Sequence, residues 1–356
     1  MTANSVLDRN RFDFRKVQDL VVKLAESSGV PHEDAVIFAE ALVWADLRGT
    51  STHGVSRVDI YLRRIGKGLI DPVADLNIRN RSPGVLVVDA ESGLGQVQAV
   101  RVLEKLYPMA TELGVASATI KNSQHFGAAS HYSELAAERD MILLVTTNSE
   151  PAMPAHGSTE AFFGTNPIAV SFPTGKGYSV KIDLATSITA RGNILAAAKE
   201  GREIPPDWAI DPEGYPTTDA ESALQGAVLT MAGHKGYALA MLVEILSGVL
   251  SGSAVGSGIG SMYKDMNREQ NVGHFFCLFD ISSFMEVSLF KERIDSMIDL
   301  IKVGRKQPGT DEIFVPGERT NKKVLENKEM GIPIDSGTLE ELETLCRERG
   351  VAFTLS

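Results

Sequence analysis

The stretch GVASATIKNSQHFGAASHYSELAAERDMILLVTTNS (residues 114–149) decides which fold class the chain is expected to have. Its first and last runs, GVASATI and MILLVTTNS, are short and apolar, which is typical of strands buried in a sheet. Between them, ASHYSELAAERD has the composition of a helix, and the polar NSQHFG joins it to the first strand. A helix between two strands predicts a mixed α/β region in the middle of the chain.

Four further runs in the middle of the chain predict strands by their apolar or alternating pattern. They are VLVVDA (85–90), IAVSF (168–172), YSVKIDLA (178–185) and HFFCLFDIS (274–282). The run GYALAMLVEILSGVL (236–250) predicts a helix of the core. We find no internal repeat, so a repeat architecture is not expected.

Both ends of the chain carry helical patterns instead. These patterns cover residues 14–30 and 32–49, the residues after Arg57, and residues 286–305 and 339–350. The last helix is expected to begin with a capping box formed by Thr338 and Glu341. A helical start and a helical end around an α/β middle suggest that the two ends pack together in one domain.

The composition is that of a globular protein with an acidic surface. Lys and Arg number 35 against 46 Asp and Glu, which gives a net charge of −11 and argues against nucleic acid or an anionic membrane as a partner. The two cysteines, Cys277 and Cys346, fit neither a metal site nor a disulfide framework, so a reducing cytoplasm is expected. The first residues, MTANSVLDRNRFDFR, lack the apolar run of a signal peptide. No apolar run reaches the roughly 18 residues that a membrane span requires.

The first candidate site is DLRGTSTHGVSR, residues 46–57. If a helix begins near Thr52, His53 and Arg57 lie four residues apart on one face. The helix dipole would then keep the His53 imidazole neutral for proton transfer, and Arg57 could hold a carboxylate through two hydrogen bonds. A proton-transfer group beside a carboxylate clamp suits a 2-hydroxy or 2-keto acid. The same residues also fit a plain helix N-cap at Ser51 or Thr52 followed by a solvated arginine.

Two further stretches place a histidine at a junction between elements. His125 lies between the strand that ends near Lys121 and the helix that starts near Gly127, a glycine that permits close approach of a ligand. In AGHKGYALAMLVEIL, His234 and Lys235 precede a long apolar helix, where free N–H groups and a lysine suit a pyrophosphate. Each pattern also occurs without a function, as a loop histidine or a glycine-rich helix start.

Asparagines near strand ends form a third group of candidates. TTNS (146–149) and GTNP (164–167) are backbone-rich turns of the kind that line ligand clefts. Asp183 lies in an otherwise apolar run, so a buried carboxylate there requires a partner, and a neutral histidine such as His53 is one option. The other option is that Asp183 caps a turn.

Several common motifs are absent from the sequence. ESGLGQVQ has two glycines of the dinucleotide fingerprint but not the third, and GSGIGS (256–261) follows a helix with the wrong spacing, so a Rossmann domain is not supported. The sequence contains neither a GxSxG nor an HExxH motif, which weakens hydrolase and metalloprotease interpretations.

Taken together, the motifs resemble one family: the malate/L-lactate dehydrogenase type, which also includes sulfolactate, ureidoglycolate and diketogulonate dehydrogenases and a cyclic-imine reductase. Seven landmarks appear in the order of that family and span roughly residues 15–340: DLRGTSTHGVSR, NSQHFGAASHY, TTNSEPAMPAHG, FGTNPIAVSFP, KIDLATS, GHKGYALAMLVEIL and FVPGER. The resemblance implies binding of NAD or NADP without a Rossmann fold, on a mixed, mainly antiparallel sheet flanked by helices. It also implies a homodimer.

The resemblance assigns roles to individual residues. His53 would transfer the proton, Arg57 would bind the substrate carboxylate, and Asp183 together with the hydroxyl of Thr52 would polarise His53. The family usually has serine before the histidine, so Thr52 is a departure that puts proton relay through this position in doubt. His125 would contact both substrate and cofactor. The remaining residues implied in cofactor binding are Phe126, Gly127, Asn148, Thr165, Asn166, His234, Lys235, Gly236 and Arg319.

The expected organisation and activity follow from these observations. We expect a helical domain of residues 1–75 joined by 286–356, a central α/β domain of 76–120 and 190–285, and a cofactor-binding segment of 121–189. The expected reaction is hydride transfer between NAD or NADP and a small 2-hydroxy or 2-keto acid, without a metal. A reductase of cyclic imino acids and a non-catalytic acid-binding protein remain as alternatives. The glycine-rich segment 256–276 is either a subunit contact or a lid.

Overall fold

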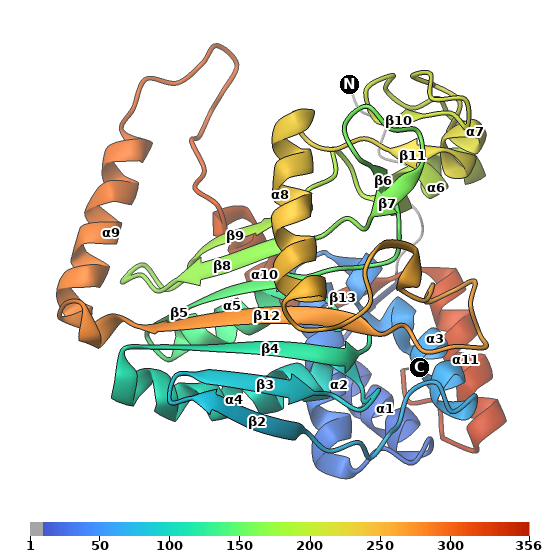
Figure 1. Cartoon of the computed structure of the whole chain (residues 1–356), viewed down its shortest axis with the longest axis horizontal. Coiled ribbons are helices and arrows are strands. Elements are labelled where there is room, and N and C mark those ends of the chain that lie inside the picture. The colour runs from blue at the N-terminus through green and yellow to red at the C-terminus, as the bar shows by residue number, and fades with distance from the viewer. Residues whose placement is uncertain (1–9, 356) are drawn as a thin grey trace.

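A seven-stranded sheet lies at the centre of the computed structural model, which describes residues 10–355 (Figure 1). The strands follow the order β2-β3-β4-β12-β5-β8-β9, and every neighbouring pair is antiparallel except β3 and β4. Their bounds are Asn77–Ser82, Val85–Asp89, Val115–Ser123, Val272–Asp280, Met141–Thr147, Ile168–Phe172 and Val180–Leu184, in the order of the sheet. The predicted mixed, mainly antiparallel sheet is therefore confirmed.

The parallel pair β3 and β4 is joined by α4 (Gly95–Leu113), which begins in the stretch that holds the incomplete dinucleotide fingerprint. A Cβ atom on Gly95 would lie 2.4 Å from the carbonyl oxygen of Gln124 and 2.6 Å from that of His125. The glycine therefore allows the start of α4 to touch the backbone that leads into the His125 loop.

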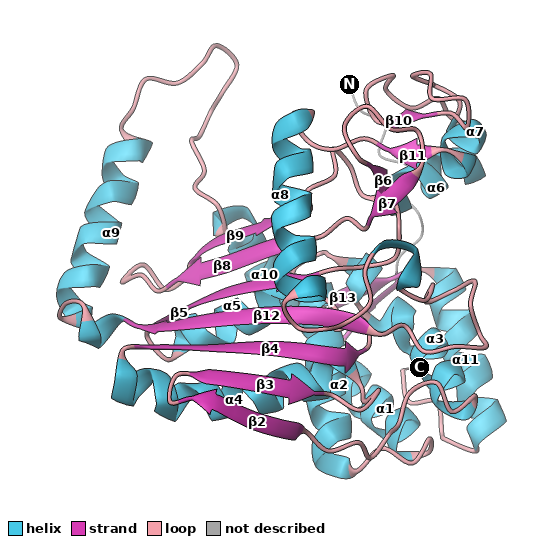
Figure 2. Cartoon of the chain, in the orientation of Figure 1, coloured by secondary structure: helices cyan, strands magenta, loops and turns pink. Residues whose placement is uncertain are grey.

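Helices cover both faces of the sheet (Figure 2). On one face lie α4 and α5 (Ala129–Glu138), which share a core with the strands. On the other face lies α8 (His234–Glu244), which continues into a π-helical turn, Ile245–Val249. This turn packs against the middle of the sheet, where the Ser247 hydroxyl is 2.8 Å from that of Thr146 on β5.

The two ends of the chain share a second core, as the sequence suggested. It contains side chains from α1 (Phe14–Glu26), α2 (His32–Leu47), α3 (Val58–Gly66), α10 (Glu318–Met330) and α11 (Ser336–Arg349). Strand β1 (Asn10–Phe12) also pairs with β13 (Ile332–Ile334). Residues 1–9, where the sequence predicts no signal peptide, lie outside the described part of the chain.

The predicted capping box at the last helix is wrong. Helix α11 begins one turn earlier than Thr338 would require, and its N-cap is Asp335, whose carboxylate accepts a hydrogen bond from the Thr338 N–H at 2.9 Å. Aspartate and threonine are both good N-cap residues, so the residue types alone do not decide which of the two caps the helix. The position at which the preceding strand ends decides it.

Two smaller units complete the fold. A lobe with its own apolar core is built from β6 (Met153–Pro154), β7 (Ala161–Phe163), α6 (Arg191–Lys199), β10 (Ala209–Ile210), α7 (Ala220–Gln225) and β11 (Ala227–Val228). Helix α9 (Val287–Lys302) stands beyond the edge of the sheet, and residues 303–317 loop outward from it (Figure 1). Its buried side chains Ile294 and Ile298 share a small core with Val180 of β9.

The expectation that residues 236–250 form a core helix is only half right. One side of α8 and its π-helical turn faces the sheet, but Leu242, Ile245, Val249 and Leu250 are exposed, Val249 by 63% and Leu250 by 58%. Leu300 of helix α9 and Val303, which follows the helix, are likewise exposed. Periodicity could not reveal this, because the helix is apolar on almost every side.

The end of α2 fixes the path of residues 49–57. Asp46 is buried there, and its carboxylate accepts a hydrogen bond from the Val55 N–H at 2.8 Å. Gly54 crosses directly over this carboxylate, because a Cβ atom at that position would lie 2.1 Å from the Asp46 Oδ1 atom.

We predict that Gly54→Ala lowers the free energy of unfolding by about 1–3 kcal/mol, the usual cost of forcing extra volume into a packed site. Urea denaturation followed by circular dichroism measures this change. Gly66→Ala is the matched control, since a Cβ atom there meets no atom within 4 Å and alanine favours the helix. Equal stability of the two variants would contradict the packing argument.

Candidate functional site

His53 and Arg57 lie on two consecutive 3-10 turns, Ser51–His53 and Val55–Arg57, and not in the first turn of an α-helix. Helix α3 starts only at Val58. The extended backbone of Gly54 (ψ −152°) separates the two turns, because the Asp46 carboxylate holds the Val55 N–H beneath it. The predicted stabilisation of a neutral His53 by the helix dipole is therefore wrong.

Burial keeps His53 neutral instead. The half-buried imidazole lies 3.0 Å from the Thr52 hydroxyl through its Nδ1 atom. Desolvation, and then the positive charge of Arg57, lower the pKa of His53 to about 4. At neutral pH one ring nitrogen is thus free to accept a proton, as the proposed acid–base role requires.

Arg57 presents only part of its guanidinium to a ligand. Its Nε–H donates to the carbonyl oxygen of Thr52 at 2.6 Å, and its Cζ atom lies 4.9 Å from the centre of the Tyr263 ring. The Nε bond ties the side chain to the backbone beside His53. The two terminal nitrogens of such a side chain can bind a carboxylate by two parallel hydrogen bonds.

His125 comes from the loop after β4 and stacks on His53, with ring centres 5.6 Å apart. Its Nδ1 atom lies 2.6 Å from the Tyr61 hydroxyl and 3.4 Å from the Gly127 backbone nitrogen. Since a backbone N–H can only donate, Nδ1 is the acceptor, and the proton of the neutral ring is on Nε2. Burial, His53 and Arg57 lower the pKa of His125 well below its usual value, so this N–H donor persists at neutral pH.

Sequence reasoning missed two residues of this cluster. Tyr61 is completely buried on α3, and its hydroxyl reaches His125. Gln270 is also buried, and its Oε1 atom accepts a hydrogen bond from the His125 backbone N–H at 3.0 Å. The spacing of Tyr61 four residues after Arg57 was a signal that the two share a face.

Asp183 is not brought into contact with His53. Its carboxylate accepts a hydrogen bond from the Ser130 hydroxyl at the start of α5, whereas the side-chain hydrogen bond of His53 goes to Thr52. Burial raises the pKa of Asp183, and the Ser130 bond opposes that shift. The residue itself is exposed to solvent in this chain.

The two candidate asparagines have their polar atoms largely committed to the fold. The side-chain nitrogen of Asn166 donates to Glu244 at 2.8 Å, and that of Asn148 donates to the Ala254 carbonyl oxygen at 2.9 Å. Glu244, buried on α8, also accepts from the Gly256 N–H at 2.9 Å. These side chains therefore hold the turns in place, and Thr165, which is half-buried beside Asn166, is the more open position.

His234 and Lys235 are the first two residues of α8, and both are exposed. Gly233 precedes them with φ +61° and no atom near its missing Cβ, and no side chain caps this helix end. Gly236 is required by packing, since a Cβ there would lie 2.1 Å from the Met231 carbonyl oxygen. An uncapped helix start with a lysine and an open glycine fits the phosphates of a dinucleotide.

The other cofactor candidates lie in different settings. The Phe126 ring is buried and stacks on His274 at 4.2 Å, so it supports the loop from inside the core. Gly127 has φ +80° and an open side, which leaves room for close approach. Arg319 is exposed at the start of α10 and lies over the Phe314 ring at 4.5 Å.

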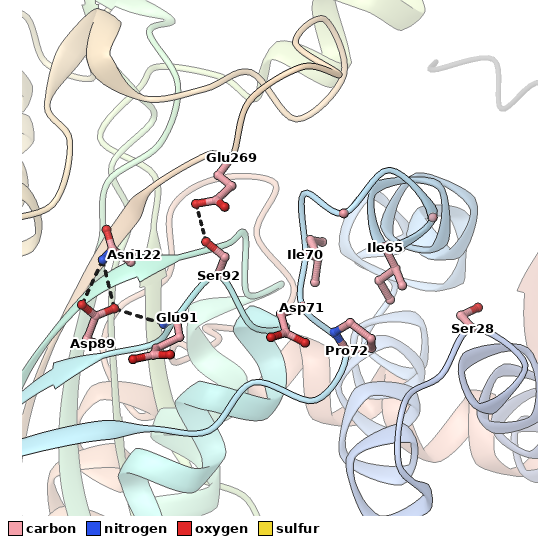
Figure 3. Close-up of a pocket in the computed structure, with 12 residues that line it drawn as sticks. Ser28, Ile65, Ile70, Asp71, Pro72, Asp89, Glu91, Ser92, Asn122 and Glu269 are labelled. Carbon is pink, nitrogen blue, oxygen red and sulfur yellow. Dashed lines mark hydrogen bonds between the residues drawn. The ribbon is translucent and has the colours of Figure 1, made fainter.

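A wide hollow of about 780 Å³ opens elsewhere on the surface (Figure 3). Four carboxylates line it, those of Asp71, Asp89, Glu91 and Glu269, and neither His53 nor Arg57 does. An acidic hollow repels an anionic substrate, so the histidine–arginine cluster is the stronger candidate site.

The described residues contain neither a candidate metal-binding group nor a candidate membrane-spanning helix. Within residues 10–355, no three His, Cys, Asp or Glu side chains are grouped so that they could hold a metal ion. None of the helices in that range combines the length and apolarity of a bilayer span.

Comparison with known proteins places the chain in a family. The family described as malate/L-lactate dehydrogenase matches residues 12–343. The L-sulfolactate dehydrogenase of Methanocaldococcus jannaschii is 38% identical over 93% of this chain and 95% of its own. The solved structure of the sulfolactate dehydrogenase from this organism superposes with a TM-score of 0.90, over 96% of this chain and 98% of that one. The malate dehydrogenase of Pyrococcus horikoshii is 37% identical over 93% of each chain.

The chain belongs to the malate/L-lactate dehydrogenase family. More distant relatives include the (2R)-3-sulfolactate dehydrogenase (NADP(+)) of Chromohalobacter salexigens, 36% identical over 83% of this chain and 89% of its own. The ureidoglycolate dehydrogenase (NAD(+)) of Escherichia coli O157:H7 is 32% identical over 86% and 87%. A solved delta1-piperideine-2-carboxylate reductase from Pseudomonas syringae superposes with a TM-score of 0.84 at 29% identity, over 94% of this dehydrogenase and 99% of that chain.

We predict that His53 of this dehydrogenase titrates near pH 4, because burial disfavours its charged form. Its C–H proton resonance, followed by NMR against pH, should show a midpoint about two units below that of an ordinary histidine. A lowered pKa keeps the imidazole deprotonated, so kcat/KM for oxidation should stay constant from pH 7 to about 5 and fall below about pH 4. A midpoint near 6.5 would contradict the assignment.

Proposed function

We propose that this chain transfers a hydride between NAD(P) and a small 2-hydroxy or 2-keto acid at the cluster of His53, Arg57 and His125. Family membership makes the chain an NAD(P)-dependent 2-hydroxyacid dehydrogenase, which argues against a non-catalytic acid-binding protein. The observation that carries the site assignment is one guanidinium with free terminal nitrogens beside two stacked, uncharged imidazoles.

Each residue of the cluster has a distinct task in this proposal. Arg57 binds the substrate carboxylate, and the Nε2–H of His125 donates to an oxygen of the substrate or to the cofactor amide. His53 gives its proton to the carbonyl oxygen during reduction and takes it back from the hydroxyl during oxidation. Bound NAD(P) supplies or accepts the hydride. Thr52 holds His53 through Nδ1, and Asp183 acts at most through Ser130.

The charges near the cluster suit an anionic substrate although the whole chain carries a charge of −11. Arg57 is a permanent cation, and the two histidines add hydrogen-bonding groups without a competing negative charge. Substrate binding beside His53 also adds a carboxylate, which favours the imidazolium form and so raises the pKa of His53 toward the range needed for proton donation.

The cofactor is proposed to lie between this cluster and the start of α8. His125 and Gly127 would meet the nicotinamide end, and His234 with Lys235 would meet the phosphates. Thr165 and the turns pinned by Asn148 and Asn166 would line the path between them. Phe126 would act through its backbone, Gly236 through helix packing, and Arg319 is the weakest candidate.

We further propose that the chain ends form the substrate-facing domain and that the protein works in the cytoplasm.

The reducible group of the substrate, a ketone or a cyclic imine, distinguishes this activity from the nearest alternative. Relatives are named for sulfolactate, malate and ureidoglycolate, and one structural neighbour reduces a cyclic imine. Both substrate classes carry a carboxylate next to the reducible carbon, so Arg57 serves either. A panel of 2-keto acids and cyclic imino acids, each with NADH and NADPH, decides between them.

We also propose that the protein is a homodimer that covers the apolar faces of α8 and α9. Leu242, Ile245, Val249 and Leu250 on the first helix and Met297, Leu300 and Val303 on or after the second are exposed in the single chain. Several exposed apolar side chains at helical spacing on each of the two segments are typical of a protein contact. Residues 286–303 stand away from the sheet, where a second copy can reach them (Figure 1).

We predict that His53→Ala lowers kcat by about 10²- to 10⁴-fold, the usual contribution of one acid–base group. Binding of NADH, measured by fluorescence titration, should be retained. His32→Ala is the matched control, since this histidine at the start of α2 has 72% of its side chain exposed. Full turnover in His53→Ala would show that another group transfers the proton.

We predict that the wild-type chain sediments at twice its mass of 38.4 kDa in analytical ultracentrifugation. The double variant Val249→Glu, Leu250→Glu should sediment as a monomer, because two carboxylates would have to be buried at the contact. Leu113→Glu, at the exposed end of α4, introduces the same chemistry elsewhere and should stay dimeric. A wild-type monomer at micromolar concentration contradicts the proposal.

A further inference from the structure

Residues 259–271, here called the roof loop, lie between the 3-10 turn Gly256–Gly258 and strand β12. The sequence left open whether this glycine-rich segment is a lid or a subunit contact. In the structure, a side chain near each of its ends is buried against the rest of the fold. Met262 is buried in the helical core, and the buried Gln270 accepts the backbone N–H of His125.

Arg64 binds backbone carbonyl groups in the middle of the roof loop. This arginine of α3 is completely buried, and its Nη1 atom donates to the carbonyl oxygens of Asp265 at 2.9 Å and Met262 at 3.3 Å. Its Nη2 atom donates to the carbonyl oxygen of Arg268 at 3.0 Å. Three backbone carbonyls on one buried guanidinium make a tightly defined loop, because breaking any bond would leave a buried charge poorly satisfied.

The roof loop includes Tyr263, a residue that is 47% exposed. The centre of its ring lies 4.9 Å from the Cζ atom of Arg57. Arg57, Tyr61 and Arg64 follow one another at spacings of four and three residues, and all three side chains reach toward the roof loop or His125. The residue that caps α3 and two residues within it thus carry the carboxylate clamp, the support of His125 and the anchor of the roof loop.

We propose that Tyr263 is a positioning residue that fixes the carboxylate clamp, and that Arg64 holds it in place. The inference rests on the proposed function and adds a residue to it. The Arg57 Cζ atom lies over the Tyr263 ring, and the Thr52 carbonyl occupies the Nε–H of Arg57. These two contacts leave the two terminal nitrogens to bind a carboxylate, and so they set the direction of the bond to the reacting carbon relative to His53.

This arrangement has a consequence for specificity. A substrate whose carboxylate is bonded directly to the reacting carbon gains the full two-pronged contact, whereas one that binds Arg57 through a single oxygen does not. Loss of the ring should therefore raise KM for 2-keto acids more than it lowers kcat, since proton transfer by His53 is left intact.

The test compares Tyr263→Ala, Tyr263→Leu and Tyr263→Phe, with Tyr215→Ala as the matched control at a tyrosine that is 70% exposed on the small lobe. A cation–π contact of usual strength corresponds to roughly a 2- to 30-fold change. We expect KM for the best 2-keto acid to rise by that factor in the alanine and leucine variants. The phenylalanine variant, which keeps the ring, should stay close to wild type.

A second readout does not depend on turnover. Phenylglyoxal modifies accessible guanidinium groups, and peptide mass spectrometry reports the rate at each arginine. We expect Arg57 to react several-fold faster in Tyr263→Ala than in wild type, while Arg63, paired with Asp59 on the solvent side of α3, reacts at an unchanged rate. Arg64→Lys, which cannot reach all three carbonyls, should accelerate the reaction of Arg57 in the same direction.

The outcomes separate the two proposals. If wild type turns over none of the 2-keto acids or cyclic imino acids, the proposed function fails, and the labelling rates still decide whether Tyr263 shields Arg57. If turnover is present and Tyr263→Ala changes neither KM nor the labelling rate, the positioning role is overturned. Faster labelling with an unchanged KM would also overturn it, because the shield would then have no effect on the substrate.

Discussion

The hydrogen bond between the Tyr61 hydroxyl and the His125 ring joins the two halves of the site. Tyr61 belongs to the core of the helical unit, where its ring also meets Phe38 edge-on at 5.3 Å, and His125 belongs to the loop at the end of β4. A buried tyrosine hydroxyl requires a partner, so this bond defines how the helices sit against the sheet. Because His53 and Arg57 lie just before α3, the same contact places them beside His125.

Electrostatics in the cluster follow from burial more than from any single ion pair. His53, His125 and His274 all have their pKa lowered by desolvation, so the rings stay neutral and serve as hydrogen-bonding groups. Arg57 carries a permanent positive charge beside these rings. This cation attracts a carboxylate, and its charge adds to the effect of burial in keeping His53 unprotonated.

The backbone around the cluster is as constrained as its side chains. Gly54 passes over Asp46, Gly95 lets α4 touch the carbonyl groups of Gln124 and His125, and Arg64 ties down the roof loop. These contacts come from α2, α3, α4 and the segment before β12, which are far apart in the sequence. Such a framework holds the cluster in a defined geometry, which the proposed hydride and proton transfer requires.

The sequence by itself determined the α/β class, the helical ends and the stretch that holds His53 and Arg57, because periodicity and local residue types carry that information. It also indicated the His125 loop and the start of α8. Tertiary structure alone decided that Asp183 pairs with Ser130, that Asn148 and Asn166 support turns, and that Tyr61, Gln270 and Tyr263 complete the cluster. These are contacts between residues up to two hundred positions apart, and only the packing of helices against the sheet brings them within hydrogen-bonding distance. The neutral state of His53 was foreseen with the wrong cause, since burial, which lowers its pKa, is a property of the folded surroundings and not of the local sequence.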